Sequence, residues 1–506
     1  MSGTLLYYER VNPTTWVYLS SLLIIALFFK FNRLWSVRNL DLVGLILLAP
    51  GLLLLLSAGL PAVRPEQVPA LQQAGYIWLF VIGGLFMIRM LLDPMMVRRP
   101  LLEPNLSAGG LAFLGAALLV FMMANVVYDA QQSDALAIAP ANTPTEGTPP
   151  ISGAKADNQV EDKSGNKIEN SAQDNTDNNN EIKTESPPAD QPLLLYGPGF
   201  PWIFDIFRLP TRLLFSGENA EPAVDQTANS QKQLQLATAR TVAILSYIAV
   251  VAGMVFIGFR HFGNTRLGIA AAVLFLLLPY IAILTGRYLE MRNIGQVYHM
   301  VAAALLVWAV AAYRRPVISG ILLGLAIGIF YYPIFLLPLW CSFYWQRGIM
   351  RFASGVVAML LLLVAVLYFR PYGSFGADLQ QMFGALLPRM NKSLLQGFWG
   401  LPFNDPVYRI PVLVAFVAMC ITLAFWPAQK NLGTLLSCSA AVMLGVQFWH
   451  ALGGGQLLAW YLPLLLLTIF RPNLEDRIAL SVLNQWSFAR RNGKLPPIPA
   501  EQAAQT

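Results

Sequence analysis

Residues 317–346 read VISGILLGLAIGIFYYPIFLLPLWCSFYWQ and contain no charged side chain. This run exceeds the ~20 residues that one helix needs to cross the ~30 Å hydrocarbon core of a bilayer. Pro333 and Pro338 interrupt it, and proline removes a backbone donor and bends or ends a helix. We therefore predict two short apolar helices that form a hairpin, with both ends on the same side of a membrane.

Further apolar runs lie on both sides of this stretch. They cover residues 16–29, 40–60, 73–92, 107–128, 239–259, 267–284, 296–313, 350–369, 410–426, 432–450 and 455–470. Of 506 residues, 56% are hydrophobic and 12% are charged, whereas roughly a quarter are charged in soluble domains. The first run lacks a small-residue cleavage site, so we count it as a span rather than a signal peptide. The sequence predicts an all-α polytopic membrane protein of about 13 transmembrane helices and excludes a soluble globule.

Basic residues orient this bundle, because cytoplasmic loops are enriched in Lys and Arg. They occupy alternate loops at Lys30, Arg33, Arg38, Arg98, Arg99, Arg260, Arg266, Arg314 and Arg315. With 317–346 as a hairpin, the later basic groups also fall on the cytoplasmic side, whereas a single crossing would put them outside. We expect the N-terminus outside, the C-terminus inside and the protein in the cytoplasmic (inner) membrane.

One long polar segment interrupts the pattern. Residues 131–192 are rich in Asn, Asp, Gln, Ser, Lys and Glu and show no apolar periodicity, which is typical of a disordered loop. We place this loop outside; binding of a partner by the loop remains an alternative. The predicted organisation is an N-terminal three-span accessory region at 1–106, a membrane core at 107–475 interrupted by the loop, and a cytoplasmic tail at 476–506.

Several function classes are excluded by composition and motifs. The net charge of +7 comes from short loops between apolar runs, so it indicates topology and not nucleic-acid binding. Cys341, Cys420 and Cys438 lie in apolar segments without metal-ligand spacing, and the chain has three His. We find no Gly-rich phosphate loop after a strand, no His-Glu-x-x-His and no Gly-x-Ser-x-Gly. No cofactor is predicted with certainty; a divalent metal ion held by outside carboxylates remains open.

The polar loop ends at YGPGFPW, residues 196–202, followed by an apolar segment that contains Asp205, Arg208 and Arg212. Such a segment predicts a juxtamembrane helix, either lying at the membrane surface or packed onto the bundle.

Three motifs together resemble the GT-C glycosyltransferases, in particular their bacterial mannosyltransferase branch, over about residues 120–475. The Tyr196–Pro198 turn is similar to the Tyr-Gly-Pro or Tyr-Pro-Pro turn before their juxtamembrane helix. Gly295-Gln296-Val297 is similar to the Gly-Gln-Val-Asn start of one of their helices. SGILLGLA at 319–326, which leads to Tyr332-Pro333, is similar to their third motif, although its glycines could simply let two helices approach closely.

The resemblance implies an inverting hexosyltransferase. Such an enzyme moves a sugar from a polyprenyl-phosphate donor to a lipid or envelope acceptor at the outer face of the membrane, among membrane lipids. It also implies a carboxylate in the first large outside loop that takes the proton from the acceptor hydroxyl. Asp129, at the outer end of the fourth span, is the first candidate, and Asp134 and Asp205 are weaker ones. Alternatively, Asp129 simply ends a helix at the interface.

The second outside loop departs from the positive-inside pattern, because it contains Arg287 and Arg292. Guanidinium groups pair well with phosphate oxygens, so we predict that these arginines bind a lipid phosphate and that Glu290 assists as acid, base or metal ligand. The alternative is Arg–Glu pairing and contact with lipid headgroups. Gln296 and His299 are one helical turn apart and are predicted to line the same cavity; a buried, satisfied His is the alternative.

The third outside loop, about 370–409, is also basic, with Arg370, Arg389 and Lys392. We predict that this loop and Tyr196 bind the substrate; an amphipathic lid on anionic lipid is the alternative. Two other functions stay open. A transporter or lipid flippase would need ionisable residues within the membrane, of which Arg89 is the main one. A noncatalytic envelope scaffold would tolerate replacement of the outside acids and arginines.

Overall fold

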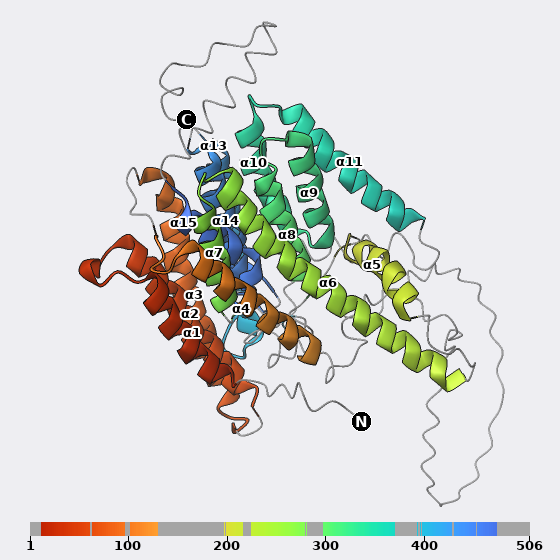
Figure 1. Cartoon of the computed structure of the whole chain (residues 1–506), viewed down its shortest axis with the longest axis horizontal. Coiled ribbons are helices and arrows are strands. Elements are labelled where there is room, and N and C mark those ends of the chain that lie inside the picture. Colours follow the sequence, from red (N-terminus) through yellow and green to blue (C-terminus); the bar gives the residue numbers. More distant parts are fainter. Residues whose placement is uncertain are drawn as a thin grey trace, which may run out of the picture.

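In the computed structural model, the chain forms a bundle of helices with no strand among the described residues (Figure 1). The structure describes residues 12–60, 63–96, 102–129, 197, 199–215, 224–278, 280, 297–369, 392, 395, 397–427, 430–451 and 453–472. The predicted polar loop at 131–192 and the tail at 476–506 lie outside these residues.

The helices follow the predicted apolar runs closely. The first seven are α1 (Pro13–Phe28), α2 (Val37–Ala58), α3 (Val68–Leu92), α4 (Ala108–Asp129), α5 (Gly199–Phe215), α6 (Val224–Arg260) and α7 (Thr265–Leu277). The others are α8 (Val297–Ala311), α9 (Pro316–Ile329), α10 (Leu337–Tyr344), α11 (Ile349–Tyr368), α13 (Arg409–Phe425), α14 (Leu432–Trp449) and α15 (Leu462–Phe470). Short 3-10 helices connect some of them, among them η7 (Tyr332–Leu336), η9 (Gly397–Gly400) and η11 (Leu458–Trp460).

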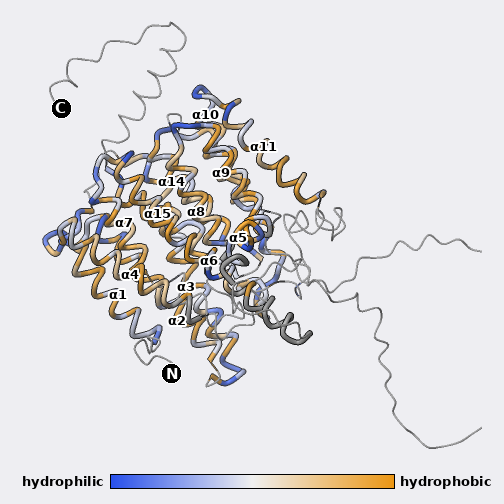
Figure 2. Tube along the Cα trace, turned by 45° about the vertical axis from the view of Figure 1, so that its right-hand side comes forward, coloured by the Kyte–Doolittle hydropathy of each residue, from blue (hydrophilic) through white to orange (hydrophobic). Residues whose placement is uncertain are grey.

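Among the described residues, six helical segments are long and apolar enough to cross a membrane, and further apolar helices are shorter. Apolar residues line the helix bodies, and hydrophilic ones gather toward their ends (Figure 2). Both features confirm an all-α multi-pass membrane protein. The count of thirteen spans remains a prediction.

The hairpin predicted at 317–346 is present as α9, η7 and α10. Phe330 leaves the helical conformation at the end of α9, with φ −147° and ψ 139°, and Pro333 lies in the first turn of η7. Helix α9 packs along α11 through glycines: a Cβ added at Gly320 would overlap the carbonyl oxygen of Phe352. The glycines of the third motif therefore do let two helices approach closely.

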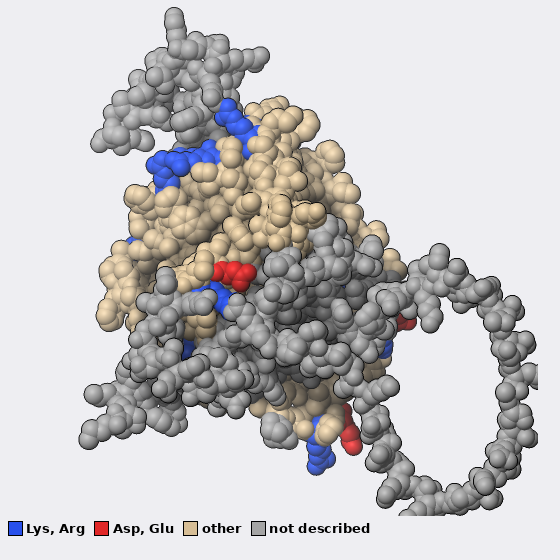
Figure 3. Space-filling model, turned by 90° about the vertical axis from the view of Figure 1, so that its right-hand side faces the viewer, with Lys and Arg blue, Asp and Glu red and all other residues tan. Residues whose placement is uncertain are grey.

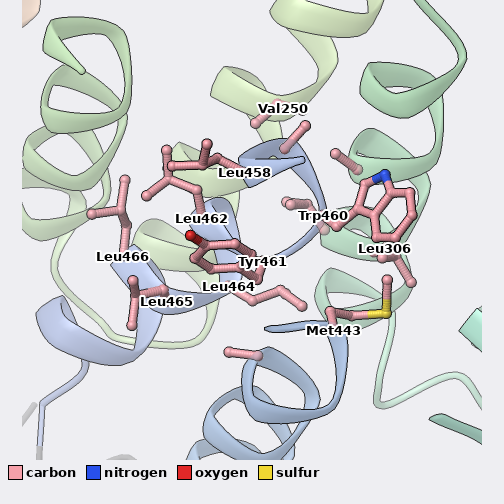
Figure 4. Close-up of a cluster of buried hydrophobic side chains, with 14 of the residues drawn as sticks. Val250, Leu306, Met443, Leu458, Trp460, Tyr461, Leu462, Leu464, Leu465 and Leu466 are labelled. Atoms are coloured by element: carbon pink, nitrogen blue, oxygen red, sulfur yellow. The ribbon is translucent and has the colours of Figure 1, made fainter. Parts of the chain in front are cut away.

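The centre of the bundle is α14, of which every residue except Phe448 is buried. Asn431 and Thr434 form a capping box at its start, which satisfies backbone donors that the first turn leaves free. The core around it includes leucines of α15, with Val250 of α6, Leu306 of α8 and Met443 of α14 nearby (Figure 4).

The predicted last span, 455–470, differs from the observed structure. Residues 453–457 are turn and irregular backbone, η11 follows, and α15 begins only at Leu462. Gly453 and Gly455 adopt φ of +68° and +92°, a region that side chains with a Cβ rarely enter. The apolar composition of this segment therefore reflects burial and not helix length.

Helices α2 and α3 are joined to the segment after α15 by a largely buried ion network. Arg89 on α3 contacts Asp41 on α2, with Nε–Oδ1 at 3.1 Å. It also contacts Asp93, the residue directly after α3, with Nη1–Oδ1 at 2.9 Å. Arg471, after α15, reaches the other Asp93 oxygen at 3.2 Å. Arg89, the charged residue that favoured a transporter, is thus neutralised by two carboxylates.

Basic side chains mark one end of the bundle. Arg314 and Arg315 lie between α8 and α9, and Arg347 lies between α10 and α11, where its Nη1 donates to the carbonyl of Lys430 at 2.7 Å. Figure 3 shows Lys and Arg gathered at this end. Their clustering agrees with the alternate-loop pattern from which orientation was predicted.

Candidate functional site

At the end of the bundle opposite these arginines, several helix termini meet around a buried cluster of rings. We call it the His299 cluster; its members are His299, Phe330, Tyr331, Tyr332, Trp449, His450 and Trp460. His299 is in the first turn of α8, Phe330 follows α9, and His450 follows α14. Each residue is next to a helix end or in a 3-10 turn. The cluster is therefore positioned by the interruptions between helices and not by the helix bodies.

A hydrogen bond fixes the imidazole of His299. Trp460 Nε1 donates to His299 Nδ1 at 2.8 Å, and the His299 residue is 6% exposed. Because indole can only donate, Nδ1 is the acceptor, and a neutral His299 ring carries its proton on Nε2. The predicted alternative of a buried, hydrogen-bonded histidine therefore describes His299.

Aromatic faces surround this histidine. Phe330 stacks on Trp460 with ring centroids 4.7 Å apart, and Tyr332 lies 4.9 Å from the same indole. His450 lies 4.8 Å from Tyr332 and 5.2 Å from Trp460. Stacked and edge-on rings of this kind form a rigid apolar wall with polar atoms at its edges.

A buried cation borders the cluster. Arg409, the first residue of α13, is 2% exposed, and its Nε and Nη2 donate to the Trp449 carbonyl at 3.3 and 3.1 Å. It also interacts electrostatically with Tyr331 and Tyr332. The site thus combines a fixed guanidinium, two histidines and aromatic faces within one buried region.

The segment that follows the long polar loop packs beside the cluster. Gly197 N donates to Ile329 O at 2.6 Å, at the end of α9. A Cβ on Gly199 would lie 2.9 Å from the Gly328 carbonyl carbon, so only glycine fits this contact. On α5, Phe200 and Phe204 are buried, whereas Leu209 is 69% exposed. Helix α5 is therefore packed onto the bundle by one face and apolar on the other.

The structure describes only some of the predicted site residues. His299 belongs to the cluster. Asp129 is the last residue of α4, and its side chain is not among those that the structure describes. Lys392 is exposed and donates to Pro402 O at 2.8 Å. Outside the described residues lie Asp134, Tyr196, Arg287, Glu290, Arg292, Gln296, Arg370 and Arg389.

Sequence reasoning missed Arg409, His450 and Trp460. Arg409 directly precedes an apolar run that we placed with its start outside, so it is one more basic residue that departs from the positive-inside pattern. The three glycines after His450 are a second signal, because such a run marks a special turn. Trp460 and His299 are 161 positions apart, and no periodicity connects them.

Metal binding has no support among the residues that the structure covers, where no group of three or more His, Cys, Asp or Glu could hold an ion. Glu290 and Asp134 are not in that set, and the Asp129 side chain is not described, so the predicted alternative of a metal ion on outside carboxylates stays a prediction. Cys420 and Cys438 are buried free thiols, as expected for packing residues.

In a comparison with known protein families, residues 230–460 match the model of glycosyltransferase family 87, a family of GT-C-type membrane glycosyltransferases. The match confirms the resemblance to GT-C glycosyltransferases and indicates a membrane glycosyltransferase. It spans α6 to η11 and so includes the described His299 cluster. No curated protein and no solved structure matches the chain.

Proposed function

Starting from its likeness to GT-C glycosyltransferases, we propose that this protein transfers a sugar from a polyprenyl-phosphate donor to a lipid or envelope acceptor. We place the reaction at the outer face of the cytoplasmic membrane. The observation that carries the proposal is the His299 cluster, a buried set of aromatic, imidazole and guanidinium groups at the end of the bundle opposite the basic connections. Sugars stack on aromatic faces, and phosphate pairs with guanidinium.

The orientation supports a lipid-linked donor. If Arg314, Arg315 and Arg347 face the cytoplasm, as the positive-inside rule predicts, the cluster faces the outside. The donor sugar must then reach the outer face of the membrane already bound to its activated leaving group. A polyprenyl phosphate does so, because its apolar chain stays in the bilayer.

In the proposed inverting reaction, the acceptor hydroxyl oxygen attacks the anomeric carbon of the donor sugar. The bond between that carbon and the phosphate oxygen breaks, and polyprenyl phosphate leaves with the bonding electron pair. Asp129 takes the hydroxyl proton, and Glu290 is the second candidate acid or base. We assign to Arg287, Arg292 and Arg409 the binding of the phosphate, whose negative charge increases as the sugar leaves.

The proposed organisation keeps the three-span N-terminal region at 1–106, the membrane core at 107–475 and the tail at 476–506. Neither a transporter nor a flippase is favoured by a specific observation. Arg89, which raised that alternative, has its charge balanced by Asp41 and Asp93 near one end of the bundle.

The test is transfer of labelled sugar from a set of polyprenyl-phosphate donors in liposomes, with and without a chelator. We expect transfer by the wild type and loss of at least 100-fold in Asp129→Asn, as for removal of a general base (~10²–10⁴). Glu103→Gln is the matched control, since Glu103 is an exposed carboxylate outside the residues proposed for the reaction. Full activity in both Asp129→Asn and Glu290→Gln would refute the catalytic assignment, and no transfer from any donor would refute the proposed reaction.

A further inference from the structure

A glycine turn joins α14 to the segment that carries Trp460. We define the glycine turn as Gly453, Gly454 and Gly455. Gln447 on α14 holds it, because its Oε1 accepts from Gly455 N at 3.0 Å and from Leu457 N at 3.3 Å. A Cβ at Gly454 would overlap the Gln447 carbonyl oxygen. The turn is therefore fixed tightly to the end of α14.

The next residue ties this turn to α3, in the N-terminal region. Gln456 Nε2 donates to the hydroxyl of Tyr76, and these residues are 4% and 3% exposed. The Tyr76 hydroxyl is closely surrounded: a Cβ at Gly397 would lie 2.9 Å from it. Because both groups are buried, removal of the hydroxyl would leave the Gln456 amide without this partner.

From Gln456, a continuous hydrogen-bonded segment leads into the His299 cluster. Leu458 N donates to Gln456 O at 2.9 Å, and Trp460 N donates to Leu457 O at 3.3 Å. Trp460 then donates to His299 at 2.8 Å. Figure 4 shows Leu458 and Trp460 in the buried core, between residues of α6, α8 and α14. Five consecutive residues thus connect Tyr76 with the histidine contact.

The same face of α3 also holds part of the third outside loop. Phe398 of η9 packs edge-on against Tyr76 and Phe80, with ring centroids 6.4 and 4.9 Å away. Trp399 donates to the Phe448 carbonyl at 3.1 Å, which attaches η9 to α14. Helix α3 therefore supports two separate segments next to the cluster.

We infer that Tyr76 is a positioning residue for the transfer reaction: through Gln456 it sets the place of Trp460 and, through Trp460, the ring orientation of His299. The inference rests on the proposed function and gives the N-terminal helices, which precede the region matched to the family, a part in building the site. Small displacements of a positioned group can lower a reaction rate strongly.

Tyr76→Phe tests this, because it removes one hydroxyl and keeps the ring that packs on Phe398. We expect transfer to fall about tenfold or more, in kcat rather than in the KM for donor. Gln456→Leu should give a similar loss, and the double variant should lose no more than the worse single one. Trp78→Phe is the matched control: it removes a hydrogen bond from α3 to Leu47 O, 2.6 Å long, that does not involve the glycine turn.

A second measurement does not depend on activity. Histidine labelled with ¹⁵N gives three sets of ring signals, assigned with His261→Gln and His450→Gln variants. We expect the His299 Nδ1 signal to shift in Tyr76→Phe and to stay unchanged in Trp78→Phe. Unchanged His299 signals in Tyr76→Phe would overturn the inference, as would equal loss of transfer in Tyr76→Phe and Trp78→Phe. If the wild type transfers no sugar, the proposed function fails, and the ¹⁵N signals alone decide the role of Tyr76.

Discussion

Replacement of Asp93 by Asn is expected to destabilise the bundle strongly. The Asp93 residue is 1% exposed and its carboxylate pairs with Arg89 Nη1 at 2.9 Å and Arg471 Nη2 at 3.2 Å. Removal of one partner from a buried ion pair costs ~3–5 kcal/mol, because the other charge stays buried without compensation. Arg89 keeps Asp41 as its partner, whereas Arg471 loses this carboxylate. We therefore expect the free energy of unfolding to fall by about 3 kcal/mol, near the lower end of that range.

The assay is equilibrium unfolding in mixed micelles with increasing SDS, followed by tryptophan fluorescence. Glu103→Gln is the matched control, since Glu103 is an exposed carboxylate and its replacement should change the free energy by less than about 0.5 kcal/mol. Asp93→Leu combined with Arg471→Met should recover part of the loss, because both charges are then removed together. A loss below about 1 kcal/mol in Asp93→Asn would refute the reasoning that this carboxylate neutralises two buried arginines.

Three further outcomes are expected. Gly320→Val should lower the free energy of unfolding by about 1–3 kcal/mol, because the added Cβ meets the Phe352 carbonyl oxygen. Gly84→Ala should not destabilise the protein, because a Cβ at Gly84 has no other atom within 4 Å. Equal losses of free energy in the two variants would contradict this reasoning. Burial lowers the pKa of His261 to about 4. As pH falls below about 6.5, the unfolded chain therefore takes up a proton on His261 before the folded protein does. Between pH 7.5 and pH 5, the free energy of unfolding should fall by about 2 kcal/mol more in the wild type than in His261→Gln, measured in the same unfolding assay. An equal fall in both proteins would argue against this. Arg409→Lys should raise the KM for the donor about tenfold in the transfer assay, since the planar pair of donors is lost, and an unchanged KM would remove this residue from the proposed phosphate site.

Sequence alone predicted the elements that composition and proline determine. The hairpin follows from a run too long for one span with Pro333 inside it, and α9, η7 and α10 confirm it. The limits of the last helix were wrong, because buried apolar residues in the glycine turn and η11 have the composition of a span without its geometry. Hydropathy indicates that a segment is buried, but only the backbone conformation distinguishes a buried turn from a spanning helix.

Prediction of the candidate site was more limited. His299 could be singled out, because it lies one helical turn from Gln296 at the start of an apolar run. Its partner Trp460 could not, since a contact across 161 positions depends on how α8 and η11 pack. Arg409 was hidden for a different reason: it stands at the edge of an apolar run, where a basic residue is ordinarily assigned to the interface.

The length of α9 has a consequence for the surrounding bilayer. Its 14 residues span about 21 Å at ~1.5 Å per residue, about 9 Å less than the hydrocarbon core. At its end the chain turns into η7, and Gly197 and α5 cover that turn. A hydrophobic surface this short is matched by lipid that thins around it or by protein that replaces lipid. We expect the bilayer to be thinner where the α9–α10 hairpin meets lipid than elsewhere around the protein.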